Sequence, residues 1–403
     1  MKLSEIWSMV GPVPVLAHRP PAATVDDLHR RARRRLPLPI ADYLDGGAEG
    51  EVSLRTNTEA FARWAFTPRS VPGVGSVDTS TTVLGTRWSA PIGLSPTGYG
   101  RLMHPDGELG VARAATLRGV PYVLSTVATT TIENVATVCD PRPPWLQLYA
   151  LRDRAVTEHM VARAHDAGCE VLELAIDTAV SGNRLRDRRN GLSIPPRLDL
   201  PTLARIGIHP AYWWAMVTNP ALDFAQVRAS EHVGTSLDGG SVADITGQFE
   251  AGLSWDDVDH LRRIWPGRLL LKGPVGAVDA VRARDAGVDG VHLSNHGGRQ
   301  LDRSVPPLVL VPEVRAAAGE DFTILVDSGV RTGADVAIAI ALGADAAFVG
   351  RPYLWGLASD GAAGVLRVID ILTEELTRTL HLLGVPDVAS LRAGGPDLVR
   401  AVP

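Results

Sequence analysis

Eight short apolar segments recur along the chain, and they constrain its fold more than any other feature. Each ends in polar or glycine-rich residues, and most are followed by a helical pattern. The segments are Pro91–Ser95, Pro121–Ser125, Trp145–Tyr149, Val171–Asp177, Arg268–Lys272, Gly290–Asn295, Thr323–Asp327 and Ala346–Gly350. Strands that are covered on both faces by helices have this continuous apolar character. The eight strand–helix units predict an α/β fold, a closed (β/α)₈ TIM barrel.

Helical patterns between these segments support the barrel. They cover Gly107–Leu117, Arg154–Ala167, Ala277–Ala286 and Thr332–Leu342. Each is followed closely by a glycine, which is favoured just past a helix C-terminus because it tolerates positive φ: Gly119, Gly168, Gly287 and Gly343. We therefore expect residues 1–403 to form a single domain with a barrel core at about 86–385.

The region before the first strand, residues 1–85, predicts a helical and flap-like extension. We expect one helix at Val25–Arg35, a second around Ile40–Leu44, and an antiparallel flap near Phe61–Leu84. The first helix carries five arginines, for which a solvated face is a better interpretation than an anionic contact surface: Arg30, Arg31, Arg33, Arg34 and Arg35.

A long insert follows the fourth strand, at about 183–254. The stretch Asn183–Leu253 has no clear period, and long loops on barrels tend to be lids or interaction segments. Tyr212, Trp213 and Trp214 could sit at a bilayer interface, or they could pack the insert against the barrel. The segment at about 201–222 is thus a candidate for peripheral membrane contact.

Charge and cysteine content exclude several classes of protein. The chain has 40 basic and 45 acidic side chains, a net charge of −5, whereas nucleic-acid binders normally carry a basic surplus. Cys139 and Cys169 lie in apolar stretches without the spacing of a metal site, so we expect no metal.

Prolines interrupt the apolar stretch Ile6 to Ala17, which makes a poor signal peptide. Other prolines interrupt Ile206–Leu222, which is therefore no convincing membrane-spanning helix. A cytoplasmic location is expected, with peripheral attachment to the inner membrane face as a variant.

Polar residues follow every predicted strand, at the end of the barrel where such enzymes build their sites. In chain order they are Thr97, Ser125, Gln147 and Tyr149, Asp177, Lys272, Ser294 to Arg299, Asp327 to Arg331, and Gly350 with Arg351. The loops after the seventh and eighth strands combine glycines with arginines, which suits a phosphate.

The run Ser294–Asp302 carries the sharpest local signal. His296 and Arg299 are three residues apart in a glycine-rich loop, which can aim an imidazole and a guanidinium into one cavity. A histidine can act as a general base and an arginine can hold a carboxylate, so the pair suits an α-substituted carboxylic acid. Lys272 ends an apolar strand, where it either forms an internal salt bridge or lies beside an electron-accepting ring.

Together these motifs resemble the FMN-dependent 2-hydroxy acid dehydrogenase/oxidase family, over about residues 25–395. The matching stretches are Asp42–Glu49, Ser95–Gly98, His104–Glu108, Gln147–Tyr149, Asp177 with Arg184, Leu271–Gly273, Ser294–Asp302, Asp327–Arg331 and Gly350-Arg351. Within the family, Leu124–Thr126, Asp177–Arg184 and the tryptophan-bearing insert are most similar to mandelate dehydrogenase.

The resemblance implies a role for each matching residue. His296 would take the substrate proton, with Asp177 as its partner, and Arg184 and Arg299 would hold the carboxylate. Tyr43 and Tyr149 would supply hydroxyl groups. Residues matching flavin-contacting positions are Pro96, Thr97, Gly98, Ser125, Gln147, Tyr149, Lys272 and Ser294. Those matching the ribityl and phosphate positions are Asp327, Ser328, Gly329, Arg331, Gly350 and Arg351.

The resemblance also implies the reaction, which is oxidation of an (S)-2-hydroxy acid to a 2-oxo acid, with a bulky or aromatic, mandelate-like substrate favoured. Ala175, Val127 and Gly98 are departures or choices that bear on the flavin contacts and the pocket. The electron acceptor would be quinone-like or oxygen, and a homotetramer is plausible. Alternatives are an oxygen-using oxidase and a flavoenzyme that modifies a peptide or natural-product intermediate. The intact His296/Arg299 pair speaks against the latter.

Overall fold

An eight-stranded parallel sheet forms the centre of the molecule in the computed structural model, which describes residues 21–191, 209–220, 222–230 and 247–402. The strands are β4 (Ile92–Leu94), β5 (Val123–Ser125), β6 (Trp145–Leu148), β7 (Val171–Ala175), β8 (Arg268–Gly273), β9 (Gly290–Leu293), β10 (Thr323–Val326) and β11 (Ala346–Val349). Their order, β4-β11-β10-β9-β8-β7-β6-β5, makes the first and last strands neighbours. A parallel bridge between Leu94 and Tyr122 joins the remaining edges. The predicted barrel is confirmed, with all eight segments as its strands.

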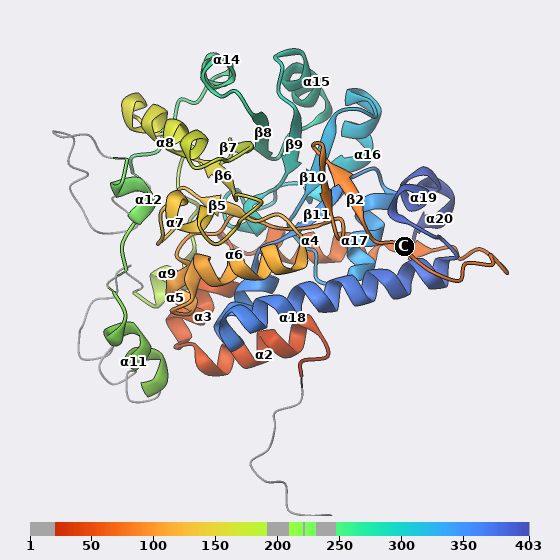
Figure 1. The fold of residues 1–403 in the computed structure, drawn as a ribbon, viewed down its shortest axis with the longest axis horizontal. Helices are drawn as coiled ribbons and strands as arrows, with labels where there is room; N and C mark the ends of the chain where they lie inside the picture. The colour runs from red at the N-terminus through yellow and green to blue at the C-terminus, as the bar shows by residue number, and fades with distance from the viewer. Residues whose placement is uncertain (1–20, 192–208, 221, 231–246, 403) are drawn as a thin grey trace, which may run out of the picture.

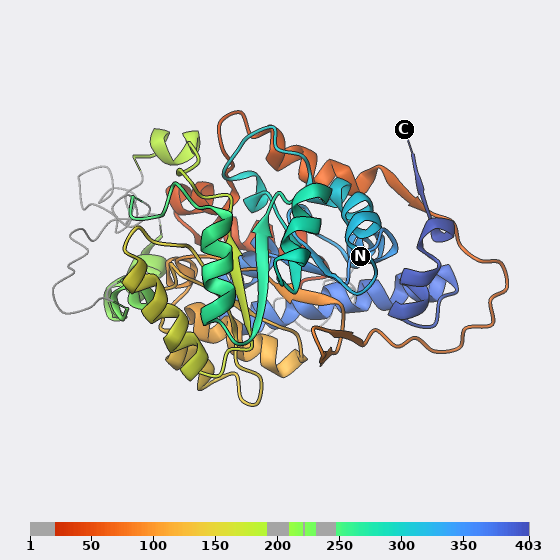
Figure 2. The same ribbon diagram turned by 90° about the horizontal axis from the view of Figure 1, so that it is seen from above.

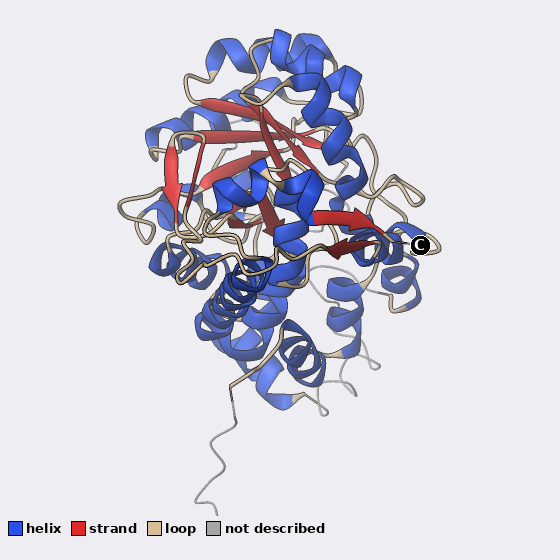
Figure 3. Ribbon diagram, turned by 90° about the vertical axis from the view of Figure 1, so that its right-hand side faces the viewer, coloured by secondary structure: helices blue, strands red, loops and turns tan. Residues whose placement is uncertain are grey.

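Helices surround this barrel (Figures 1 and 3). Those that follow its strands are α6 (Gly107–Arg118), α7 (Ile132–Ala136), α8 (Arg154–Asp166), α14 (Trp255–Ile264), α15 (Ala277–Asp285), α16 (Pro307–Ala318), α17 (Gly333–Ala341) and α18 (Arg351–Leu383). Gly119, Gly168, Gly287 and Gly343 all have positive φ just past their helices, as the sequence predicts. Capping boxes begin α14 and α17.

The barrel interior has an apolar layer below its polar mouth. Val123, Trp145, Val171, Leu270, Leu325 and Phe348 pack together there with Trp88. Because side chains alternate along a strand, the next inward positions lie one layer nearer the carboxyl ends of the strands. A second, larger cluster fills the space between the strands and the surrounding helices.

The N-terminal extension differs in part from its prediction. Helices α2 (Val25–Arg35) and α3 (Leu38–Asp45) are confirmed, but the flap at Phe61–Leu84 is wrong over much of its length. Its first residues end the unpredicted helix α4 (Val52–Ala62), and β1 (Trp64–Phe66) pairs with the distant β12 (Val399–Ala401). Only β2 (Thr81–Val83) forms a local hairpin, with β3 (Thr86–Trp88). A partner this far along the chain leaves no signal in local periodicity.

The arginines of α2 are more than a solvated face. Helix α2 runs beside α18 (Figure 1), and Arg31 and Arg35 lie within 3.8 and 3.7 Å of Asp360 in that helix. Arg33 pairs with Asp45 at the end of α3, at 3.0 Å. Ion pairs across elements therefore explain part of this basic cluster.

The insert is described only in part, because 192–208, 221 and 231–246 lie outside the described residues, as does the stretch Ile6 to Ala17. It contains the short helices α9 (Leu185–Arg189), α11 (Pro210–Thr218) and α12 (Ala225–Arg228). Helices α11 and α12 lie at the opposite end of the molecule from α19 (Val388–Ala393) and α20 (Gly395–Leu398) (Figures 1 and 2). A further short helix, α5 (Gly100–Met103), precedes α6, and η1 (His296–Gly298) follows β9. No helix in the described parts is long and apolar enough to cross a membrane.

Candidate active site

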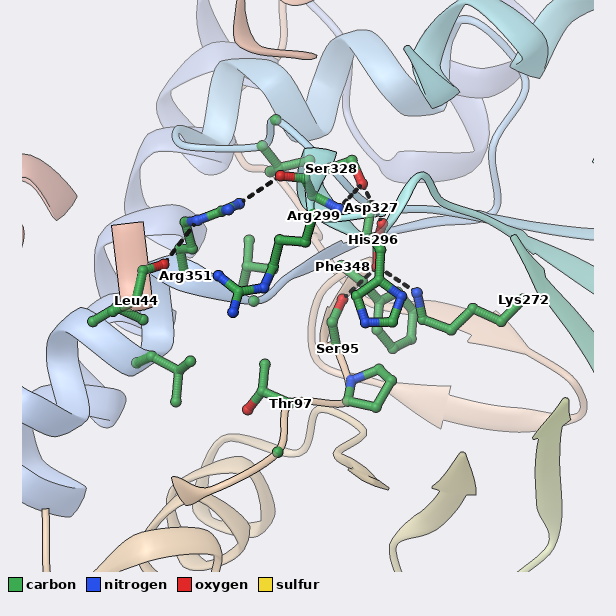
Figure 4. A pocket seen from close by; sticks show the side chains of 18 of the residues that line it. Leu44, Ser95, Thr97, Lys272, His296, Arg299, Asp327, Ser328, Phe348 and Arg351 are labelled. Carbon is green, nitrogen blue, oxygen red and sulfur yellow. Dashed lines mark hydrogen bonds and ion pairs between the residues drawn. The ribbon is translucent and has the colours of Figure 1, made fainter. Parts of the chain in front are cut away.

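A cavity opens at the carboxyl ends of the barrel strands, with about 1050 Å³ of space that includes part of its open mouth. Its lining combines apolar side chains with convergent polar ones, which suits a site for a small molecule or cofactor. The predicted residues that line it are Tyr43, Pro96, Thr97, Gly98, Tyr149, Arg184, Lys272, His296, Arg299, Asp327, Ser328, Gly329, Arg331, Gly350 and Arg351. Figure 4 shows the side chains of His296 and Arg299 at the same cavity as Lys272. The loop thus brings imidazole and guanidinium together, as the spacing predicts.

The remaining four predicted residues lie directly behind this lining. Asp177 contacts His296, and Ser294 Oγ accepts a hydrogen bond from Lys272 Nζ at 2.8 Å. Ser125 donates to Gln147 Oε1 at 3.1 Å in the barrel interior. The Gln147 amide nitrogen is buried without a partner in the described structure, so it is a free donor close to the barrel mouth.

His296 is held between a carboxylate and a phenol. Its Nδ1 lies 3.3 Å from Asp177 Oδ2, and its Nε2 lies 3.3 Å from the Tyr149 hydroxyl. The His296 backbone has φ of 58°, a left-handed conformation that is uncommon outside glycine and often marks functional sites. Because Asp177 engages Nδ1, Nε2 is the nitrogen that can exchange a proton with a bound molecule.

Two arginines meet Tyr43 at one side of the cavity. The guanidinium carbons of Arg299 and Arg184 lie 4.8 and 5.4 Å from the centre of the Tyr43 ring. Arg184 also pairs with Asp187 at 2.9 Å. Burial, and next the charge of Arg184, lower the pKa of Arg299. A carboxylate bound here would relieve this repulsion between like charges.

Two more arginines, the half-buried Arg331 and Arg351, lie where the loops after β10 and β11 meet. No carboxylate in the described parts lies within ion-pair distance of either, and the Arg351 guanidinium donates to the carbonyls of Leu44, Gly46 and Gly297. Burial lowers the pKa of Arg331 to about 10, and burial together with Arg299 and Arg331 lowers that of Arg351. Two cations at one end of a cavity, neither with a carboxylate within ion-pair distance in the described parts, suit a phosphate group.

Lys272 forms the internal salt bridge that its sequence position allows. Its Nζ lies 2.9 Å from Asp327 Oδ2, and both side chains line the cavity. The salt bridge and a place beside the cavity therefore occur together, rather than as alternatives.

Sequence reasoning did not assign a site role to Ser95 and Tyr99, which line the cavity, or to Tyr353, which contacts the lining residue Thr97. Ser95 donates to Asp327 at 3.0 Å, and the Tyr353 hydroxyl lies 2.6 Å from that of Thr97. The Tyr99 ring lines the cavity and its buried hydroxyl has no partner among the described residues. Ser95 is the first residue of the matching stretch Ser95–Gly98 and Tyr99 follows it directly, which was a usable signal, whereas Tyr353 lies inside a helix and gave none.

Gly98 is closely packed against Val127. A Cβ at Gly98 would lie 2.6 Å from Val127 Cγ2, so the two positions determine each other's size. Ala175 is buried at the end of β7, next to Lys272 in the sheet register.

No group of three or more His, Cys, Asp or Glu side chains within the described ranges could hold a metal ion.

Comparison with known proteins agrees with this architecture. The family model for FMN-dependent dehydrogenases matches residues 32–398. A putative L-lactate dehydrogenase of Mycobacterium tuberculosis is 43% identical over 90% of this chain and 86% of that protein. The 4-hydroxymandelate oxidase of Amycolatopsis orientalis is 39% identical over 91% of this chain and 96% of that protein. The crystal structure of the monotopic membrane protein (S)-mandelate dehydrogenase superposes with a TM-score of 0.88 at 36% identity, covering 94% of this chain and 100% of that one.

Proposed function

Because the chain belongs to the FMN-dependent dehydrogenase family, we propose that it oxidises an (S)-2-hydroxy acid with a bulky or aromatic side chain to the 2-oxo acid. The observation that carries this proposal is the meeting of His296, backed by Asp177, with Arg299 at one cavity. Bound FMN supplies the acceptor for the two electrons of the substrate.

In this proposal, Arg299 and Arg184 bind the substrate carboxylate, and both guanidinium groups lie close to the Tyr43 ring. The two guanidinium groups supply the positive charge, and the Tyr43 and Tyr149 hydroxyl groups add donors beside the reacting carbon. His296 Nε2 then takes the hydroxyl proton or the α-proton of the substrate. Asp177 stabilises the imidazolium that results, because its carboxylate lies against Nδ1.

We assign the remaining residues to FMN. The ring would contact Pro96, Thr97, Gly98, Ser125, Gln147, Tyr149, Lys272 and Ser294, and the ribityl phosphate would contact Asp327, Ser328, Gly329, Arg331, Gly350 and Arg351. The unpartnered Gln147 amide and the two arginines without carboxylates support this division.

The relatives of this chain include proteins named for lactate and for mandelate, so the size of the substrate side chain has to be determined by experiment. We favour an aromatic acid because the (S)-mandelate dehydrogenase structure superposes with a TM-score of 0.88 over 94% of this chain. Anaerobic titration of the FMN-loaded protein with glycolate, (S)-lactate and (S)-mandelate tests this, with bleaching of the flavin absorbance as the readout. Mandelate should bleach the flavin at the lowest concentration.

The His296→Ala variant is the control for this titration. It should retain FMN and lose most of the bleaching rate, about 10²–10⁴-fold, as expected for removal of a general base. Bleaching by lactate but not by mandelate would contradict the proposed side-chain size. Absence of bleaching by every 2-hydroxy acid would contradict the proposed reaction.

We further propose that the electrons pass to a quinone-like acceptor while the protein is attached peripherally to a membrane at the inner face. Helix α11 supports this, because Trp214 and Val217 are 72% and 80% exposed and lie three residues apart. Oxygen is the alternative acceptor, and stopped-flow reoxidation of the reduced protein distinguishes the two: reoxidation by air within milliseconds would favour an oxidase. A homotetramer remains part of the proposal, and sedimentation analysis tests it.

A further inference from the structure

Four charged or ionisable side chains meet inside the barrel, beneath the cavity. Glu173 comes from β7, Lys272 from β8 and His292 from β9, and Asp327 follows β10. Glu173 and His292 are fully buried, and the side chains of Lys272 and Asp327 are 7% and 9% exposed. Only Lys272 and Asp327 line the cavity, so Glu173 and His292 form a second row behind them.

The four groups form one connected series. Glu173 Oε1 lies 2.9 Å from His292 Nδ1, and His292 Nε2 lies 3.3 Å from Asp327 Oδ2. The same Asp327 oxygen lies 2.9 Å from Lys272 Nζ. The contact between His292 and Asp327 is an ion pair without the alignment of a hydrogen bond, since Nε2 has no hydrogen-bond partner. Acidic and basic groups therefore alternate from Glu173 to Lys272.

Packing alone gives no reason for the Glu173–His292 pair. Apolar residues adjoin both groups, since Leu270 pairs with Glu173 and Leu325 with His292 in the sheet register, and the His292 ring lies 4.7 Å from that of Phe348. One Glu173 oxygen is buried without a partner. Burying such a pair usually costs as much as it contributes, and apolar residues of similar volume serve a core equally well.

The charge of His292 is set by its neighbours. Burial acts to lower its pKa, but Glu173, and less strongly Asp327, overcome this and raise it. Lys272 opposes this rise in the His292 pKa, and its own pKa is nevertheless raised, because Asp327 and Glu173 outweigh burial. The raised pKa favours the protonated form of His292, and His292 and Lys272 both lie within 3.3 Å of the same Asp327 oxygen.

We propose that Glu173 and His292 are positioning residues that raise the electron affinity of bound FMN. His292 shares the carboxylate of Asp327 with Lys272, so that less of the Lys272 charge is neutralised within the protein. More of that positive charge then faces the cavity, where it stabilises the negative charge gained by the ring on reduction. This inference rests on the proposed placement of the ring beside Lys272, and it does not depend on which acid is the substrate.

The Glu173→Leu/His292→Leu double variant tests the inference in the FMN-loaded protein. It removes one negative and one positive charge together and leaves an apolar layer that should still fold. We expect a lower midpoint potential for the bound FMN. We also expect about tenfold weaker binding of sulfite, an anion that adds to the oxidised ring and is held more tightly beside a positive charge. Neither measurement requires the substrate.

Leu270→Val is the matched control. Leu270 pairs with Glu173 in the sheet register and lies two residues before Lys272 on the same strand, so its truncation disturbs the same part of the barrel without changing charge. It should lower the melting temperature and leave both the potential and the sulfite affinity unchanged. If the Glu173→Leu/His292→Leu variant does not retain FMN, the Glu173→Gln/His292→Gln variant replaces it, because it removes the same charges and keeps hydrogen-bonding groups.

An unchanged midpoint potential and sulfite affinity in the Glu173→Leu/His292→Leu variant would overturn the inference. Glu173 and His292 would then only fill space in the barrel interior. A lower potential in a variant that no 2-hydroxy acid reduces would support the inference while contradicting the proposed reaction. The two failures are therefore distinguishable.

Discussion

At the scale of single residues, the loop that carries His296 depends on contacts that hold an unfavourable backbone. His296 and Ser328 both have positive φ, of 58° and 69°, and Ser328 Oγ accepts a hydrogen bond from the Gly297 amide at 3.0 Å. Asn295 and Asn57 exchange two side-chain hydrogen bonds, at 2.7 and 2.8 Å. Such conformations cost about 1–3 kcal/mol each and persist only where their surroundings fix them. The position of His296 is therefore built by α4 and by the loop after β10, as well as by its own loop.

The Asp177→Asn variant should separate catalysis from binding. Its amide cannot stabilise a protonated His296 as the carboxylate does, so we expect kcat to fall by about tenfold or more, within the range of general base catalysis. KM should change little, because Asp177 lies behind His296 and not in the cavity lining.

The matched variant is Asp187→Asn, which removes the partner of Arg184 at 2.9 Å. Here we expect KM for the acid to change more than kcat. Steady-state kinetics on both variants checks the pair of predictions, and a fall in kcat of the same size in both would contradict the separate roles.

Gly98→Ala should be destabilising because the new methyl group would lie 2.6 Å from Val127 Cγ2. Inserting a methyl group into a closely packed site costs about 1–3 kcal/mol. The Gly98→Ala/Val127→Ala double variant opens the space again and should recover much of this loss. Urea unfolding of the FMN-loaded proteins measures both effects, and equal stability losses in the single and double variants would show that Val127 is not the obstacle.

At the scale of elements, one carboxylate joins three helices around the cavity. Asp45, at the end of α3, lies 3.0 Å from His29 Nε2 and 3.0 Å from Arg33 Nη1 in α2, and it accepts a hydrogen bond from Trp355 Nε1 of α18 at 2.9 Å. Leu44, its neighbour, lines the cavity. The same contacts that hold the extension against α18 therefore place one wall of the site.

Asp45→Asn should lower the free energy of unfolding by about 1–3 kcal/mol at neutral pH. Burial alone would raise the Asp45 pKa, but the hydrogen bonds from His29 and Trp355 and the charge of Arg33 lower it below 3.8. A carboxyl with a lowered pKa stabilises the fold above its unfolded pKa, and this contribution is lost as the pH falls through its folded pKa. The difference between wild type and variant should thus be constant near neutrality and shrink below about pH 3.8. Urea unfolding at several pH values measures it, and a difference that grows in acid would contradict the assignment.

The sequence predicts elements well where their signal is local. Gly119 and Gly343 end helices where expected, and the apolar strands are recognisable without any knowledge of their partners. Most site motifs are likewise local, because they directly follow a strand and the barrel brings the strand ends together, whereas Tyr43 comes from helix α3 of the N-terminal extension. What sequence reasoning missed depends on distant contacts: β1 pairs with β12, and Tyr353 reaches Thr97 from α18. In the sequence, His292 and Glu173 only interrupt apolar strands, and their contact of 2.9 Å inside the barrel is between strands that are far apart in the chain.

At the scale of the whole molecule, the barrel mouth and the insert form one functional end. Helix α11 belongs to this end, since the Tyr212 hydroxyl donates to the Leu102 carbonyl at 3.0 Å, next to the loop that carries Thr97 and Gly98. Tyr212 thereby packs the insert against the barrel, while Trp214 in the same helix stays exposed. Tyr212 thus supports the interpretation that the aromatic cluster packs the insert against the barrel, and Trp214 supports the interpretation that it contacts a bilayer interface.

Trp214→Ser/Val217→Ser should weaken binding to phospholipid vesicles by about tenfold or more, because each large apolar side chain contributes roughly 1.5–3 kcal/mol when it leaves water. Flotation of the protein with vesicles measures this. Val278→Ser is the control, since Val278 is 83% exposed in α15, away from α11. Equal binding by wild type and both variants would place any membrane contact elsewhere.

The pairing of β4 with β11 has a consequence for biosynthesis. In the sheet register, Ile92 pairs with Ala347 and Leu94 with Val349. One edge of β4, the first barrel strand, therefore stays unpaired until β11, the last barrel strand, has been synthesised. During translation, the nascent chain must hold that edge open while the intervening units emerge from the ribosome. Loading of FMN should consequently be a late event, because Thr97 and Arg351 come together only when this seam closes.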